Sequence, residues 1–159
     1  MTARAAQMTV GSIALLAAWL GAALIIAAVG APAAFAVLPT RALAGALVGR
    51  ALPAVFTTGV LVAVVLLVTH RLAESGRLVG GMGSLMFLAI GAANVVALRI
   101  AAMRASIGVP IDSLDPSDSR RMAFGRMHGL SVILLGLGML CAFVALVALS
   151  RHLLSRSSP

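Results

Sequence analysis

The stretch VGSIALLAAWLGAALIIAAV, residues Val10–Val29, decides the fold. It has no charged residue and is as long as an α-helix that crosses the roughly 30 Å hydrocarbon core of a bilayer. Backbone groups in lipid find no water to bind, so a long Leu/Ala/Val-rich run forms a helix and not a barrel strand. Three similar runs follow it. The predicted spans are 10–31, 51–69, 78–98 and 128–150, with a polar loop at 105–127.

The composition agrees with this pattern. The chain of 159 residues is 62% hydrophobic and 10% charged, whereas soluble domains are close to half apolar and a quarter charged. We therefore predict an all-α fold, an integral membrane four-helix bundle, with one membrane domain over residues 1–159. The net charge of +8 comes from arginines that flank the apolar runs, where they meet anionic headgroups. The expected partner is thus the lipid bilayer and not nucleic acid. Self-association or other membrane proteins stay open.

Local signals refine the first two spans. Ala34-Phe35-Ala36 resembles a signal-peptidase site, but the apolar region before it is longer than a secretory h-region of about 7–15 residues, so we expect a retained first helix. Pro32 should kink or end that helix. Gly45 and Gly49 form a GxxxG spacing that lets two helices approach closely in lipid.

The polar loop holds three of the four acidic residues, Asp112, Asp115 and Asp118. Asp115-Pro116-Ser117-Asp118 is typical of a helix start, with Asp115 as N-cap, Pro116 at the first helical position and Asp118 in the first turn. This capping role explains two of the acids without a metal ion. Cys141 is the only cysteine, which excludes an intrachain disulfide and a cysteine-based metal site.

Four spans place alternate connections at opposite ends of the bundle. We call the end that carries the loops at about 39–50 and 99–127, together with the adjoining helix ends from Pro32 and Asn94 and as far as Ser131, the motif end. His70 lies at the opposite end, roughly 30 Å from His128, so the two cannot share a haem or a metal. The arginine distribution favours a cytoplasmic motif end, with seven there (Arg41, Arg50, Arg99, Arg104, Arg120, Arg121, Arg126) against five (Arg4, Arg71, Arg77, Arg151, Arg156).

A candidate polar site follows from helical spacing. Phe124, His128 and Ser131 share one helix face, and Asn94 and Arg99 end the third span at the same end of the bundle. Polar groups at membrane depth are costly unless they are paired or line a wet cavity. Asn94 and Ser131 have an alternative role as interhelical hydrogen-bonding residues, and His128 has one in packing. The candidate site is His128, Ser131, Asn94 and Arg99, with no catalytic, cofactor or metal-binding residue assigned.

Several of these residues resemble a known family. Trp19-Leu20-Gly21, Pro32, Phe35 and Gly45, followed by Asn94, Asp115-Pro116 and Phe124…His128-Gly129-Leu130-Ser131, resemble the transmembrane protein 205-like family, whose bacterial members are catalogued as a domain of unknown function, number 4149. Leu135 and Val95 stand where the family usually has Asn and Pro. The resemblance implies a four-helix membrane protein, here of a bacterial plasma membrane, with vertebrate relatives associated with resistance to platinum drugs. It implies no established reaction or cofactor.

The expected function is a non-enzymatic binding or assembly component of the membrane, because no nucleophile–base pair and no phosphate-binding loop is present. An alternative is a small oligomeric carrier for a solute or a metal-containing drug, with Met122 and Met127 as soft ligands. A haem or redox protein is the third hypothesis, and the separation of His70 from His128 argues against it.

Overall fold

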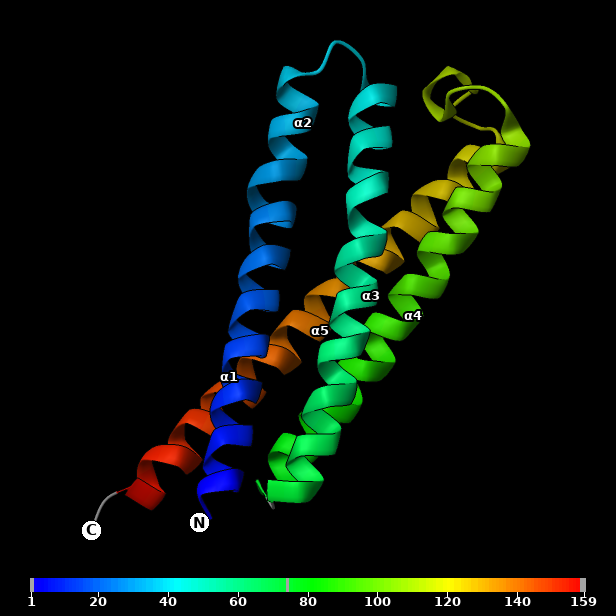
Figure 1. Cartoon of the computed structure of the whole chain (residues 1–159). Coiled ribbons are helices and arrows are strands. Elements are labelled where there is room, and N and C mark those ends of the chain that lie inside the picture. Colours follow the sequence, from blue (N-terminus) through cyan, green and yellow to red (C-terminus); the bar gives the residue numbers. More distant parts are fainter. Residues whose placement is uncertain (1, 74, 158–159) are drawn as a thin grey trace.

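The computed structural model describes residues 2–73 and 75–157, with side chains as far as Ser155. Four long rods make up the fold (Figure 1). The first is α1 (Ala3–Leu24), a π-helical segment η1 (Ile25–Gly30) and α2 (Ala31–Val37) in succession. The others are α3 (Arg41–Ala73), α4 (Arg77–Ile107) and α5 (Ser119–Ser157), with a short 3₁₀ turn η2 (Ile111–Ser113) before α5.

The prediction of an all-helical membrane bundle is confirmed. Each of the four rods is long and apolar enough to cross a membrane, and the protein is a membrane protein. The rods are longer than the predicted spans, because the sequence pattern marks only the uncharged part of each helix. A helix of 33 residues is about 50 Å long, so its ends extend beyond the hydrocarbon core into the headgroup layers.

The prediction that Pro32 could end the first helix is wrong. The rod continues to Val37, where Leu38 turns to an extended conformation before Pro39. Proline removes the N–H that would bond the carbonyl four residues earlier. That carbonyl belongs to Ala28, inside the π-helical segment, where the bonding pattern is already shifted and the N–H of Ala31 reaches the carbonyl of Ile26. The segment therefore accommodates Pro32 without a break.

Glycines allow close contacts between helices at several points in the bundle. A Cβ at Gly59 in α3 would lie 2.7 Å from the Trp19 indole of α1, and Nε1 of Trp19 donates to the carbonyl of Val55 at 2.9 Å. In the same way, Gly138 of α5 leaves room for Ile90 of α4. At the start of α4, Gly80 and Gly83 lie against α3 side chains, whereas a Cβ at Gly81 would meet nothing within 4 Å.

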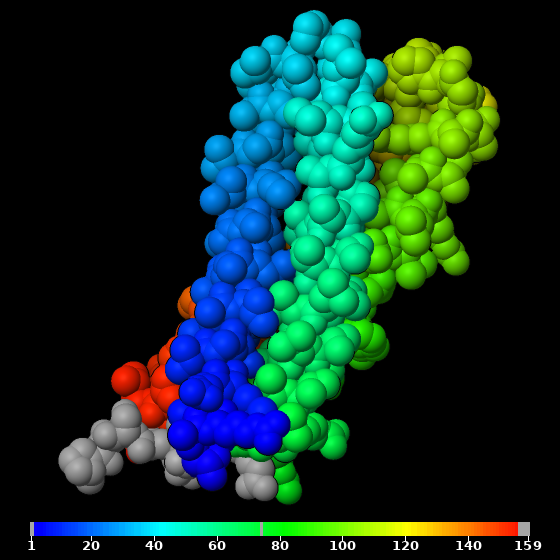
Figure 2. Space-filling view, in the orientation of Figure 1, coloured from blue at the N-terminus to red at the C-terminus, as the bar shows by residue number. Residues whose placement is uncertain are grey.

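The bundle widens at the motif end. α4 packs on α3 and α5, α1 packs on α3 and α5, and α2 packs on α3. In Figure 1, α5 crosses behind the other rods, from the loop at the upper right to the C-terminus at the lower left. The start of α5 consequently lies with α4 and away from α2. Figure 2 shows the 105–118 loop standing beside the start of α3 at this end.

The predicted cap of α5 was three residues too early. α5 begins at Ser119, and Asp118 is its N-cap: its side chain accepts from the backbone N–H of Arg120 at 2.8 Å, and its carbonyl accepts from the N–H of Met122 at 3.1 Å. Asp115 instead closes the turn before it, by accepting from the N–H of Ser117 at 2.8 Å. Aspartate suits both roles, and the spacing alone did not distinguish them.

These contacts set the acidity of the two carboxyl groups in the loop. The hydrogen bonds from the Arg120 side chain and backbone lower the pKa of Asp118 to about 2. The Ser117 hydroxyl and N–H lower the pKa of Asp115. Both groups are therefore ionised at neutral pH, and each holds its segment of the loop in place through its charged form.

Candidate functional site

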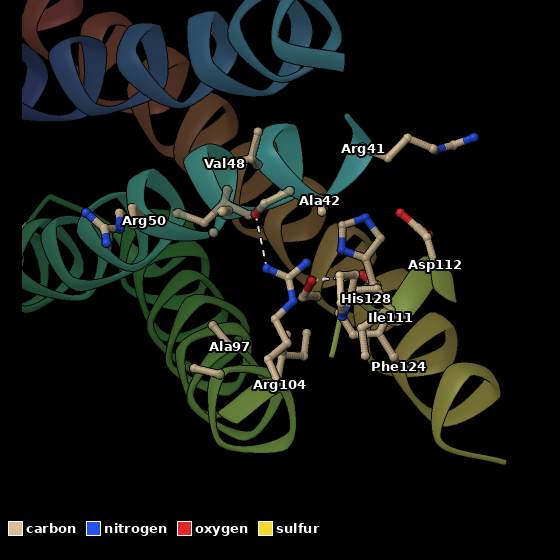
Figure 3. A pocket seen from close by; sticks show the side chains of 18 of the residues that line it. Arg41, Ala42, Val48, Arg50, Ala97, Arg104, Ile111, Asp112, Phe124 and His128 are labelled. Atoms are coloured by element: carbon tan, nitrogen blue, oxygen red, sulfur yellow. Dashed lines mark hydrogen bonds between the residues drawn. The ribbon is translucent and has the colours of Figure 1, made fainter. Parts of the chain in front are cut away.

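A pocket of about 820 Å³ opens at the motif end, between α2, α3, α4, the η2 turn and α5. Its inner part is mostly apolar, and its lining there is Leu52, Pro53, Phe56, Ala97, Ile100 and Ser131. Nearer the loops it is lined by charged and aromatic side chains, which Figure 3 shows from close by. Ligand pockets are typically about 300–1,000 Å³, with an apolar lining and a few convergent polar groups. The size and lining of this pocket fit that description.

Arg104 joins three helices across the pocket. From α4, its Nη1 donates to the carbonyl oxygen of Gly45 in α3 at 3.1 Å. Its guanidinium carbon lies 4.9 Å from the ring centroid of Phe124 in α5, a cation–π geometry. The side chain is half-buried. Among the described residues, no carboxylate oxygen lies within 4.0 Å of the Arg104 guanidinium. The ion pair of this part of the chain joins Arg120 to Asp118.

The GxxxG spacing of α3 makes room for this arginine. A Cβ at Gly45 would lie 3.1 Å from Nη2 of Arg104, and a Cβ at Gly49 would lie 3.1 Å from Nη1. The predicted close approach at these glycines is therefore found, but the group that approaches is a guanidinium and not a second helix backbone. Glycines here let the charged group lie directly on the α3 main chain.

The predicted shared face of α5 is confirmed. Phe124, His128 and Ser131 all line the pocket. The Phe124 and His128 rings are parallel to within 4°, with centroids 6.1 Å apart. Ser131 is buried, and its hydroxyl donates to the carbonyl of His128 at 2.8 Å. The imidazole is exposed, so the packing alternative for His128 extends only to its stacking on Phe124.

Positive charge dominates the mouth of the pocket. Arg41, Arg50 and Arg104 line it, against one carboxylate, Asp112. Figure 3 shows that Arg41 and Arg50 extend toward opposite sides, while Arg104 and His128 lie between them. Arg104 is thus the guanidinium at the centre, and the other two add to the positive potential around it.

Two of the predicted site residues do not line the pocket. Asn94 lies one turn deeper on α4 than Ala97, the innermost α4 residue of the lining, and makes no hydrogen bond to any described residue. Arg99 is exposed on another face of α4, since it precedes Arg104 by five residues, or about 140° around the helix. The predicted four-residue site is reduced to His128 and Ser131, with Arg104 in the position that we assigned to Arg99.

The remaining family-motif residues divide in the same way. Phe35, Gly45 and Phe124 line the pocket, whereas Pro32 and Gly129 are exposed elsewhere and Asp115 belongs to the loop turn. His70 lies at the opposite end of the bundle from His128, as predicted, and His152 lies at that end too. Within residues 2–73 and 75–157, no three His, Cys, Asp or Glu side chains come together as a metal site.

One family model matches the first three of the four rods. The description "Domain of unknown function (DUF4149)" matches residues 14–107, which run from α1 to the end of α4. The chain belongs to the DUF4149 family. No protein with a curated description and no solved structure matches the chain.

The DUF4149 match covers one wall of the pocket and not the other. Phe35, Gly45, Gly49 and Arg104 lie inside the matched residues, while Phe124, His128 and Ser131 follow them. One further α5 position bears on the resemblance drawn from the sequence. Leu135, which replaces a usual Asn, is 6% exposed and belongs to the hydrophobic core, and it does not line the pocket.

Sequence reasoning missed the central role of Arg104. The sequence pattern places it only among the seven arginines of the motif end, which are expected to meet the headgroups. Its position on the same helix face as Ala97 and Ala101, at i, i+4 and i+7, places it over small residues that line a cavity. That pattern, together with the glycines at the start of α3, was the available signal.

Proposed function

We propose that this DUF4149 protein is a non-enzymatic membrane protein that binds a small amphiphilic ligand in the pocket at its motif end. The observation that carries the proposal is the pocket itself, with an apolar inner part and a polar, arginine-lined mouth. It lies where long helices extend past the hydrocarbon core, so a ligand there would have one part at the headgroup layer and one part within the bundle.

The polar groups of the pocket support binding more than catalysis. The hydroxyl of Ser131 bonds to a main-chain carbonyl of its own helix and not to the imidazole of His128, so it lacks the base that activates a serine nucleophile. Met122 and Met127 do not line the pocket, which removes the soft sulfur ligands that motivated a metal-drug carrier. We further propose that the chain is related to the transmembrane protein 205-like proteins and resides in a bacterial plasma membrane.

The test is the retention of a small molecule by the purified protein. Native mass spectrometry of protein extracted in a mild detergent should find a bound molecule near one per chain. Ala101→Phe places a large side chain in the pocket lining, so this variant should no longer retain the bound molecule. Ala92→Phe is the matched control, since Ala92 is an exposed alanine of the same helix that does not line the pocket. A protein with no bound molecule, or equal retention in both variants, would contradict the proposal.

A further inference from the structure

The half-buried guanidinium of Arg104 gives the pocket a preference for anions. Arg104 has five N–H donors, and within the described part of the chain its side chain makes one hydrogen bond, to the neutral carbonyl of Gly45. Its guanidinium also lies over the neutral ring of Phe124. Neutral acceptors stabilise a partly buried cation less than an anion does, because only an anion adds a charge–charge attraction. An anionic group in the pocket therefore gains more from Arg104 than a neutral or zwitterionic one.

The surroundings of Arg104 add to this preference. Three arginines and one aspartate line the pocket, so its mouth carries excess positive charge whatever the state of His128. Gly45 and Gly49 carry no Cβ, so the terminal nitrogens of the guanidinium lie close to the α3 main chain. The N–H groups of this planar guanidinium that do not bond to Gly45 can donate to the oxygens of a phosphate group.

The inner part of the pocket is suited to a hydrocarbon group. Below Arg104 the lining turns apolar, with Leu52, Pro53, Phe56 and Ala97. A small hydrated anion gains nothing from such a surface, whereas an acyl chain is stabilised by about 0.8 kcal/mol for each CH₂ group that leaves water. An anion linked to a short stretch of hydrocarbon would occupy both parts at once.

We propose that the pocket binds the phosphate group of an anionic amphiphile, with Arg104 as its principal contact and the start of an acyl chain against the apolar lining. This inference rests on the proposed function, because it names the ligand class of the same pocket. The phosphate of a membrane lipid and free inorganic phosphate share the recognising chemistry, and the experiment separates them.

The probes are dioctanoyl phosphatidic acid, dioctanoylglycerol, dioctanoyl phosphatidylcholine and inorganic phosphate, each titrated into delipidated full-length protein and followed by native mass spectrometry. Phosphatidic acid should bind most tightly. Arg104→Gln should weaken its binding roughly tenfold or more, the size of effect expected from a lost charged hydrogen bond. Arg99→Gln, which changes an exposed arginine of the same helix outside the pocket, should bind like the wild type. Arg104→Lys keeps the charge without the planar set of N–H donors, so its affinity for phosphatidic acid should lie between those of the wild type and Arg104→Gln.

The outcomes distinguish this inference from the proposed function. Equal binding of dioctanoylglycerol and phosphatidic acid, unaffected by Arg104→Gln but abolished by Ala101→Phe, would overturn the anion preference and leave the pocket as a binding site. Inorganic phosphate binding as tightly as phosphatidic acid would overturn the amphiphile and leave a phosphate site. Binding of no probe by wild-type protein that unfolds cooperatively would overturn the inference altogether.

Discussion

Nη1 of Arg104 lies 3.1 Å from the carbonyl oxygen of Gly45, a residue 59 positions earlier in the chain. This hydrogen bond joins α4 to the start of α3 at the end of the bundle where the helices diverge. Because Phe124 of α5 lies on the same guanidinium, one side chain connects three helices around the pocket. The pocket and the local stability of the bundle therefore depend on the same residue.

Arg104→Met tests the structural part of this role. Methionine keeps an apolar side chain of similar reach but loses the hydrogen bond and the cation–π contact. We expect the free energy of unfolding to fall by about 1–2 kcal/mol, the range for a hydrogen bond to a charged group that is partly screened by solvent. Thermal unfolding in detergent measures this, with Arg99→Met as control. Equal loss in both variants would show that Arg104 does not connect the helices.

Gly59→Ala tests the contact between α1 and α3. The new methyl group would lie 2.7 Å from atoms of the Trp19 indole, and this ring is 5% exposed and hydrogen-bonded, so it has little room to move. Overpacking of this kind costs about 1–3 kcal/mol, and the fluorescence of the single tryptophan should change with it. Gly21→Ala is the control, since nothing lies within 4 Å of its added Cβ. A stable variant with unchanged fluorescence would contradict the contact.

The low pKa of the Asp118 carboxyl group determines how the start of α5 responds to acid. Its folded-state pKa of about 2 lies below the ordinary value of about 3.9. A depressed pKa means that its contribution to stability is full above the ordinary value and is lost as the pH falls toward the folded-state value. The carboxyl carbon signal of Asp118 should titrate with a midpoint near 2 in an NMR experiment on the folded protein. A midpoint near 4 would show that the cap does not form.

The arrangement of the ends predicts a labelling pattern. Single cysteines at positions 70 and 115, in a Cys141→Ser background, should react with an impermeant reagent from opposite sides of the membrane. Position 70 lies in the last turn of α3 and position 115 in the loop before α5, so one span separates them. Labelling of both from one side would mean that a rod does not cross.

The sequence was sufficient to predict the four spans, because long uncharged runs have no other stable form in lipid. It also predicted the shared face of Phe124, His128 and Ser131 from helical spacing. It did not predict where the helices diverge, and that divergence decides which polar residues line the pocket. Asn94 has a suitable direction on α4 but lies one turn too deep, and Arg99 has a suitable depth but the wrong direction. The sequence also did not predict the start of α5 or its N-cap at Asp118, because several aspartates in the loop are equally suited to cap a helix or to close a turn.

Photoaffinity labelling tests the central claim most directly. A phosphatidic acid analogue with a diazirine near the start of its acyl chain can be incorporated with the protein into nanodiscs, cross-linked and mapped by peptide mass spectrometry. We predict adducts concentrated at Leu52, Pro53, Phe56 and Ala97 in the apolar part of the pocket, and their loss in Ala101→Phe. Adducts spread over the exposed apolar faces, as at Leu61, Leu88 and Ile133, and unchanged by Ala101→Phe, would contradict the claim that this pocket is the binding site.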